Sequence, residues 1–147
     1  QVVHRIDQVG AGEGGNGLTL EELAEMLRQA AKQYLADDVT VEVVFAEQAD
    51  DTALGKLKQV LEANERGERD VVIVNYLQSR LTGDPEGAVG HFAPLAAYDR
   101  ERGSVLLLDP DRRWYEPYWS PVQALLEGMA TKDETSGKMR GYVWIRR

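Results

Sequence analysis

The chain has 147 residues, of which 43% are hydrophobic and 29% are charged, and this length and composition suit one globular domain. A formal net charge of −8 argues against nucleic acid as a partner, because neutralising phosphates requires a basic face. The apolar runs, such as residues 71–74 and 105–108, are far shorter than the ~20 residues that span a bilayer, so no membrane partner is predicted. The chain contains no cysteine, which excludes disulfides, thiolate metal sites and a thiol nucleophile within it.

The N-terminal residues show no basic region followed by an apolar stretch, so no signal peptide is predicted. We expect a soluble protein, either cytoplasmic or periplasmic, and the lack of an initiator Met suggests a start further upstream. His4 lies in this unpatterned region and is interpreted as a solvated surface residue.

Residues 1–17 end in a glycine-rich stretch and are predicted to form a flexible N-terminal segment. The pattern Gly10-x-Gly12-x-x-Gly15 also matches the dinucleotide-binding fingerprint, in which a helix opens at the glycines. Here the helix does not begin until its cap at Thr19, several residues after the glycines. The strand that follows the helix also extends further from the glycines than the ~20 residues at which the fingerprint has its acidic residue. A flexible loop is therefore favoured over a dinucleotide-binding domain.

The first helix has a clear start, because Thr19 and Glu22 form a capping box. Its predicted apolar stripe consists of residues 20, 23, 27, 30, 31 and 34. Residues 39–45 are β-branched and partly alternating, which predicts a strand.

A second amphipathic helix is expected to begin with Asp51 or Thr52 as its cap and to stop near Gly67. Residues 71–76 follow as a buried strand, because they are a run of mostly β-branched residues. A loop over residues 82–87 then leads to the second half of the chain.

Residues 90–109 consist of two apolar runs around a turn at residues 99–103, which predicts a β-hairpin. The aromatic residues of segment 114–119 precede a short helix with Ser120 at its cap, and residues 141–145 form a last strand. Because helices come first and strands cluster later, we predict an α+β fold with a mainly antiparallel sheet and flanking helices.

The hairpin places His91 and Asp109 near each other. If Tyr98 faces Ser104, the residue numbers of each cross-strand pair sum to 202, and His91 lies diagonally across from Asp109. If they sum to 200, His91 lies directly opposite Asp109. Both registers put them on one face with Cβ atoms roughly 5–8 Å apart, whereas a slip of one residue separates them. On one face, Asp109 could fix the imidazole tautomer, as in the base–orienter half of a catalytic triad. From spacing alone, a structural histidine is the favoured interpretation.

The other candidate side chains are interpreted as structural. Two histidines and no cysteine give no metal-ligand spacing, so no metal site and no cofactor are predicted. Trp114, Tyr115, Tyr118 and Trp119 are interpreted as core or cleft wall, and Asn75 as a hydrogen bonder at a strand end.

Four segments of the chain resemble phytochelatin synthases and occur in the same order as in that family. They are residues 71–77 (VVIVNYL), 90–98 (GHFAPLAAY), 106–109 (LLLD) and 136–142 (SGKMRGY). The resemblance covers nearly all of residues 17–145 and is greatest to the short bacterial members, because the cysteine-rich C-terminal extension of plant members is missing.

The resemblance implies a papain-like cysteine peptidase fold, with residues 18–147 as the C-terminal part of the catalytic domain. It also implies a Cys-His-Asp triad that acts on glutathione. In that family the thiolate attacks the Cys–Gly amide, releases glycine and forms a γ-glutamylcysteinyl thioester, which passes to water or to a second glutathione to make phytochelatin. His91 would be the general base and acid, with Asp109 as its orienter. Asp133 and Arg140 would hold the α-amino and α-carboxylate groups of the γ-glutamyl moiety.

The segment that carries the nucleophilic cysteine in this family is absent from the sequence, so we expect the chain alone to be inactive. The expected partners are glutathione or γ-glutamyl thiol peptides, free or as metal thiolates, and either an upstream cysteine-bearing segment or a second copy of the chain. The alternative is a non-catalytic module that has lost its nucleophile and binds thiol peptides or a partner. The resemblance to the short bacterial members of the family favours a peptidase that releases glycine from glutathione over an enzyme that synthesises phytochelatin.

Overall fold

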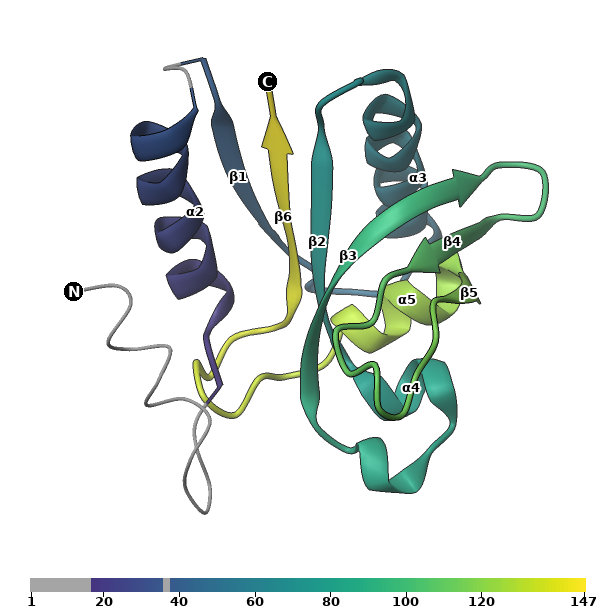
Figure 1. The fold of residues 1–147 in the computed structure, drawn as a ribbon. Coiled ribbons are helices and arrows are strands. Elements are labelled where there is room, and N and C mark those ends of the chain that lie inside the picture. Colours follow the sequence, from purple (N-terminus) through teal and green to yellow (C-terminus); the bar gives the residue numbers. More distant parts are fainter. Residues whose placement is uncertain (1–16, 36–37) are drawn as a thin grey trace.

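An antiparallel six-stranded sheet forms the centre of the computed structural model, which describes residues 17–35 and 38–147 (Figure 1). Its strand order is β1-β6-β2-β3-β4-β5, and every pairing is antiparallel, which confirms the predicted α+β class. The elements in chain order are α2 (Leu20–Tyr34), β1 (Thr40–Phe45), α3 (Asp51–Arg66), β2 (Val71–Leu77), α4 (Gln78–Thr82), η1 (Pro85–Gly87), β3 (Gly90–Asp99), β4 (Ser104–Leu107), β5 (Tyr118–Pro121), α5 (Val122–Met129) and β6 (Gly141–Arg146). His4 and the glycine-rich stretch lie outside the described residues.

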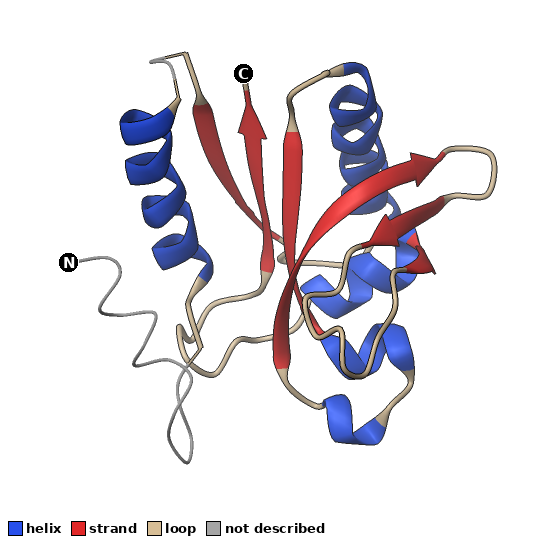
Figure 2. Ribbon diagram, viewed as in Figure 1, coloured by secondary structure: helices blue, strands red, loops and turns tan. Residues whose placement is uncertain are grey.

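Helices cover both faces of the sheet (Figure 2). On one face, α3 and α5 pack against β2, with further contacts of α3 to β3 and of α5 to β5, and bury Leu57, Leu61 and Leu125. On the other face, α2 packs Leu20 and Ala24 against β1 and β6. None of the helices within the described ranges is long and apolar enough to cross a membrane.

The two long helices begin and end close to the predicted positions. The capping box of Thr19 and Glu22 is present at α2, but Tyr34 in its last turn is 75% exposed, so it does not belong to the apolar stripe. The cap of α3 is Asp50 rather than Asp51 or Thr52, because Asp50 has an extended backbone and accepts a hydrogen bond from the Ala53 N–H at 2.8 Å. The predicted stop at Gly67 is correct.

The β3–β4 hairpin forms, but its register next to the turn differs from both predicted registers. Tyr98 pairs with Val105 rather than with Ser104. Because side chains alternate between the faces of a strand, this shift by itself would put His91 and Asp109 on opposite faces.

A β-bulge reverses the shift. The register changes between Leu95 and Ala97, and beyond the bulge Leu95 pairs with Leu107. The extra residue on β3 restores the face relation on which the pairing of His91 with Asp109 depends. The predicted proximity is therefore correct. Beyond the bulge, the pairing of Leu95 with Leu107 agrees with the predicted register in which paired residue numbers sum to 202, and only the stretch next to the turn departs from it.

Two features of the second half were not predicted. The end of the aromatic segment forms an edge strand, β5, in which Trp119 is 53% exposed; Trp114, in the preceding loop, is 77% exposed, so neither ring belongs to the core. Ser120 belongs to β5 and does not cap α5, whose first turn follows Pro121 without a side-chain cap.

The last strand, β6, lies in the interior of the sheet between β1 and β2. Gly141 makes this insertion possible, because a Cβ at this position would lie 1.9 Å from the carbonyl oxygen of Val44. The insertion also brings residue Arg140, immediately before β6, toward the start of β3.

Candidate functional site

His91 and Asp109 form a hydrogen-bonded pair at the start of β3. The His91 Nε2 atom lies 2.7 Å from Asp109 Oδ1, and the His91 side chain is 17% exposed. Asp109 is 1% exposed and lies two residues after the end of β4. The β-bulge and the β2–β3 pairing of Tyr76 with His91 position the imidazole over this carboxylate.

The Asp109 carboxylate accepts hydrogen bonds on both oxygens. Oδ1 accepts from His91 and from the backbone N–H of Asp111 at 2.8 Å. Oδ2 accepts from the Tyr76 hydroxyl at 3.4 Å and from Gln78 Nε2 at 3.5 Å. A buried carboxylate requires such donors, and together they leave Asp109 little freedom to rotate away from His91.

Two phenols extend this network. The hydroxyl oxygens of Tyr76 and Tyr118 are 3.0 Å apart, and Tyr118 is the donor of the two because Tyr76 gives its hydrogen to Asp109. Burial and the contact with Tyr118 hold the pKa of Tyr76 far above its ordinary value, and burial likewise raises the pKa of Tyr118. Both phenols therefore stay protonated donors. The Tyr76 ring also meets the His91 ring edge-on, with centroids 5.8 Å apart.

The orientation of the imidazole determines its chemistry. Because Nε2 faces Asp109, the carboxylate favours the tautomer with hydrogen on Nε2 and stabilises an imidazolium. Nδ1 has no hydrogen-bond partner among the described residues, so it is the nitrogen that can exchange a proton. Since the chain has no cysteine, it holds this acid–base pair without a thiol nucleophile.

Arg140 is the second buried charged residue of the site, at 6% exposed. Its Nη1 donates to Thr131 Oγ1 at 3.1 Å and to the Lys132 carbonyl oxygen, and its Nη2 lies 3.9 Å from Asp133 Oδ1. Burial lowers the pKa of Arg140, while the charges of Asp133 and Glu134 raise it. The guanidinium is thus held in a desolvated position by its own chain.

One edge of the Arg140 guanidinium lies against Gly90, the residue that precedes His91. A Cβ built on Gly90 would be 2.9 Å from Nη2 and 3.1 Å from Nε, yet 3.5 Å from Cζ, so it would lie beyond the Nε–Nη2 edge and not over the flat face. Nε is buried and has no hydrogen-bond acceptor among the described residues. An unpaired buried donor of this kind is unusual and is a natural partner for a ligand oxygen.

Asp133 has a structural task in addition to facing Arg140. Its carboxylate accepts from the backbone N–H groups of Thr135 and Ser136 at 3.2 Å and from the Ser136 hydroxyl at 2.7 Å. These bonds organise the turn that returns to β6 through Gly137, whose φ is +71°. The four predicted residues therefore form two pairs, His91–Asp109 and Asp133–Arg140, which meet where Arg140 contacts Gly90.

Sequence reasoning missed the residues that surround these pairs. Tyr76 and Gln78 are two positions apart where β2 ends, and pairing β2 with β3 would have placed them beside His91. Asn75 was interpreted as a strand-end hydrogen bonder, but it lies inside β2, paired with Phe92 and Gly141, and is 4% exposed. Its side chain makes no hydrogen bond within the described part of the chain, so it too is a candidate for contact with a ligand.

No group of three or more metal-ligating side chains occurs among residues 17–35 and 38–147. A cavity of about 450 Å³ is lined by Gln78 and Asp111, which both donate hydrogen bonds to Asp109, and by the exposed Trp114. The arrangement is a histidine–carboxylate pair with an adjacent buried cation, in a chain that contains no cysteine thiol.

Comparison with known proteins identifies a family. The family described as "Phytochelatin synthase" matches residues 13–142. The chain is 42% identical over 74 residues to "Glutathione gamma-glutamylcysteinyltransferase 3" of Lotus japonicus, which covers 50% of this chain and 15% of the relative. It is 43% identical over 58 residues to "Glutathione gamma-glutamylcysteinyltransferase 1" of Arabidopsis thaliana (40% and 12%) and 32% identical over 80 residues to the Schizosaccharomyces pombe enzyme of that name (53% and 18%). The matched stretches thus span less than a fifth of each relative. Since the family match extends over most of this chain's 147 residues, the chain belongs to the phytochelatin synthase family.

Proposed function

We propose that this chain is the acid–base and substrate-binding part of a papain-like thiol enzyme that cleaves the Cys–Gly amide of glutathione. The observation that carries the proposal is the 2.7 Å pair of His91 with the buried Asp109, in which Nδ1 has no hydrogen-bond partner among the described residues. A nucleophilic cysteine comes from a segment outside this sequence or from another chain. Hydrolysis to γ-glutamylcysteine is favoured over phytochelatin synthesis, in keeping with the proposed likeness to short bacterial members.

In this reaction His91 Nδ1 takes the proton of the cysteine thiol, and the thiolate attacks the carbonyl carbon of the Cys–Gly amide. The imidazolium then gives its proton to the glycine nitrogen as the C–N bond breaks, which leaves the γ-glutamylcysteinyl thioester. In the second half, His91 takes a proton from water or from the α-amino group of a second glutathione, and that oxygen or nitrogen bonds to the thioester carbonyl carbon. The C–S bond then breaks, and the imidazolium returns its proton to the cysteine sulfur. Asp109 stabilises the imidazolium through Nε2 in both halves.

Arg140 and Asp133 would hold the γ-glutamyl end of the substrate. The unpaired Nε of Arg140 supports this role, because a substrate α-carboxylate would supply the missing acceptor. The negative charge of the Asp133 carboxylate would attract the α-ammonium group, while its oxygens also accept hydrogen bonds from Thr135 and Ser136 in the turn. The contact of Arg140 with Gly90 places this charge beside the residue that carries the acid–base chemistry.

A second candidate is a binding module without catalysis. It is favoured by one observation, the absence of any cysteine from the chain. The His91–Asp109 pair would then be a structural remnant, and the Arg140 region would bind γ-glutamyl thiol peptides.

The test is glycine release from glutathione by the purified chain, with and without a cysteine-bearing N-terminal segment added as a fusion. The chain alone should release no glycine above buffer, and the fusion should be active. The matched control is the same fusion with that cysteine changed to Ser, and a second control carries His91→Ala. An inactive fusion that still binds glutathione would instead support the binding module.

A further inference from the structure

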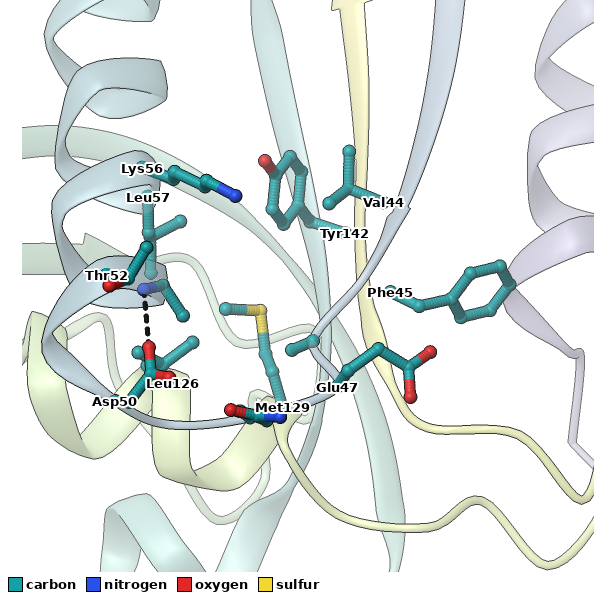
Figure 3. Close-up of a pocket in the computed structure, with 13 residues that line it drawn as sticks. Val44, Phe45, Glu47, Asp50, Thr52, Lys56, Leu57, Leu126, Met129 and Tyr142 are labelled. Carbon is teal, nitrogen blue, oxygen red and sulfur yellow. Dashed lines mark hydrogen bonds between the residues drawn. The ribbon is translucent and has the colours of Figure 1, made fainter.

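A second pocket lies away from the His91–Asp109 and Arg140 pairs, between the end of β1, the first turns of α3 and the C-terminal end of α5 (Figure 3). Its volume is about 320 Å³, at the lower end of the ~300–1,000 Å³ typical of ligand pockets. Leu57, Leu126 and Met129, which belong to the buried core, form part of its apolar wall. None of the proposed catalytic or substrate-binding residues lines it.

Two polar groups reach into this pocket. Figure 3 shows the Lys56 ammonium and the Tyr142 ring on the same side, facing each other above the apolar wall. Neither group has a hydrogen-bond or ion-pair partner in the described ranges. Burial, with the charge of Glu42, raises the pKa of Tyr142 to about 12, so its hydroxyl remains a donor at neutral pH. An ammonium and a phenol donor over an apolar wall suit an anion with a hydrocarbon body.

The acidic residues at the rim do not cancel this preference. Asp50 is engaged as the cap of α3, where its carboxylate accepts from the Ala53 N–H (Figure 3). The Glu47 side chain extends away from Lys56, to the other side of the chain end of β1. Glu42, whose charge acts on Tyr142, does not line the pocket and is paired with Arg146 at 2.8 Å. Lys56 therefore remains the cationic side chain of the lining.

We propose that this pocket binds a small organic carboxylate, with its carboxylate group on Lys56 and Tyr142 and its apolar chain against Leu57, Leu126 and Met129. The size of the cavity limits the ligand to a compact molecule, and the Lys56 ammonium, which has no ion-pair partner among the described residues, favours an anion over a cation. The site would give the protein a ligand in addition to the γ-glutamyl thiol peptide, and it does not depend on the proposed reaction.

The experiment is an NMR titration of the ¹⁵N-labelled 147-residue chain with sodium hexanoate, and with hexan-1-ol and hexylammonium as probes of equal length. Hexanoate should produce saturable amide shifts around residues 44–57 and 126–129 with a dissociation constant of roughly 1–10 mM. Lys56→Met should weaken binding at least about tenfold, since it removes a charge-assisted hydrogen bond. Lys58→Met, on the same helix but outside the pocket, is the matched control and should leave binding unchanged.

A cavity-filling variant, Ala53→Leu, should abolish the shifts while Lys56 is still present, and Arg140→Lys should not affect them. Three results would overturn the proposal: no saturable shifts, equal binding by Lys56→Met and the unmodified chain, or hexan-1-ol binding as tightly as hexanoate. Shifts centred on residues 131–140 would also overturn it, because they would place the carboxylate on Arg140.

Discussion

Gly90→Ala is expected to displace the Arg140 guanidinium, and the geometry gives the size of the effect. The added Cβ would lie 2.9 Å from Nη2, closer than Cβ atoms approach such atoms in real structures, and 3.1 Å from Nε, which is tighter than most real contacts. A long side chain at the surface could swing aside, but Arg140 is 6% exposed and is tied through Nη1 to Thr131 and to the Lys132 carbonyl oxygen. Movement must therefore weaken or break charge-assisted hydrogen bonds.

Each such bond contributes about 1.5–3 kcal/mol, so the free energy of unfolding should fall by roughly 2–4 kcal/mol. For a chain of this length, that corresponds to a drop in the melting temperature of roughly 5–15 °C. Urea unfolding followed by circular dichroism measures the change. Gly55→Ala in α3 is the matched control, because no atom lies within 4 Å of its Cβ position; it should stabilise the protein by about 0.4–1 kcal/mol.

A double-mutant cycle identifies the partner. In an Arg140→Met background, the flexible and uncharged Met side chain has no bonds to lose, so Gly90→Ala should cost less than about 0.5 kcal/mol. An equal cost in both backgrounds, or a Gly90→Ala variant as stable as the unmodified chain, would show that Gly90 is not there to admit Arg140.

Three further outcomes are expected. In the cysteine-bearing fusion, His91→Ala should lower glycine release by at least ~10²–10⁴-fold. Asp109→Ala should lower it less, and Asp109→Asn least, because Asn keeps a carbonyl acceptor for the imidazole N–H. An unfolded His91→Ala variant would contradict the catalytic role. Arg140→Lys should weaken substrate use roughly ten- to a hundredfold, since Lys lacks the planar fork, and unchanged kinetics would assign Arg140 to structure alone. Tyr76→Phe should lower the free energy of unfolding by about 1–2 kcal/mol, whereas Tyr98→Phe, whose hydroxyl has no hydrogen bond in the described ranges, should not. Because the pKa of Tyr76 is raised on folding, its contribution is full below about pH 10 and is lost as the pH rises further, so Tyr76→Phe should make the alkaline loss of stability less steep.

Local features of this protein could be read from its sequence. The capping box of Thr19 and Glu22, the end of α3 at Gly67 and the strand that became β2 all depend on interactions within a few residues. Hydrogen bonds at helix ends and the periodicity of apolar residues are determined locally, so they survive without knowledge of the tertiary structure. The proximity of His91 and Asp109 was also within reach, because a short turn confines both to one hairpin.

Only the tertiary structure determined which distant segments meet. β6 inserts between β1 and β2, and this long-range pairing brings Arg140 against Gly90, 50 positions earlier in the sequence. It also determines that Tyr76 of β2 donates to Asp109 beyond β4. Strand order and bulges follow from the packing of the whole sheet, and no local pattern records them. The sequence could therefore name His91, Asp109 and Arg140, while the donors that hold Asp109, the burial of Arg140 and its contact with Gly90 came from the fold.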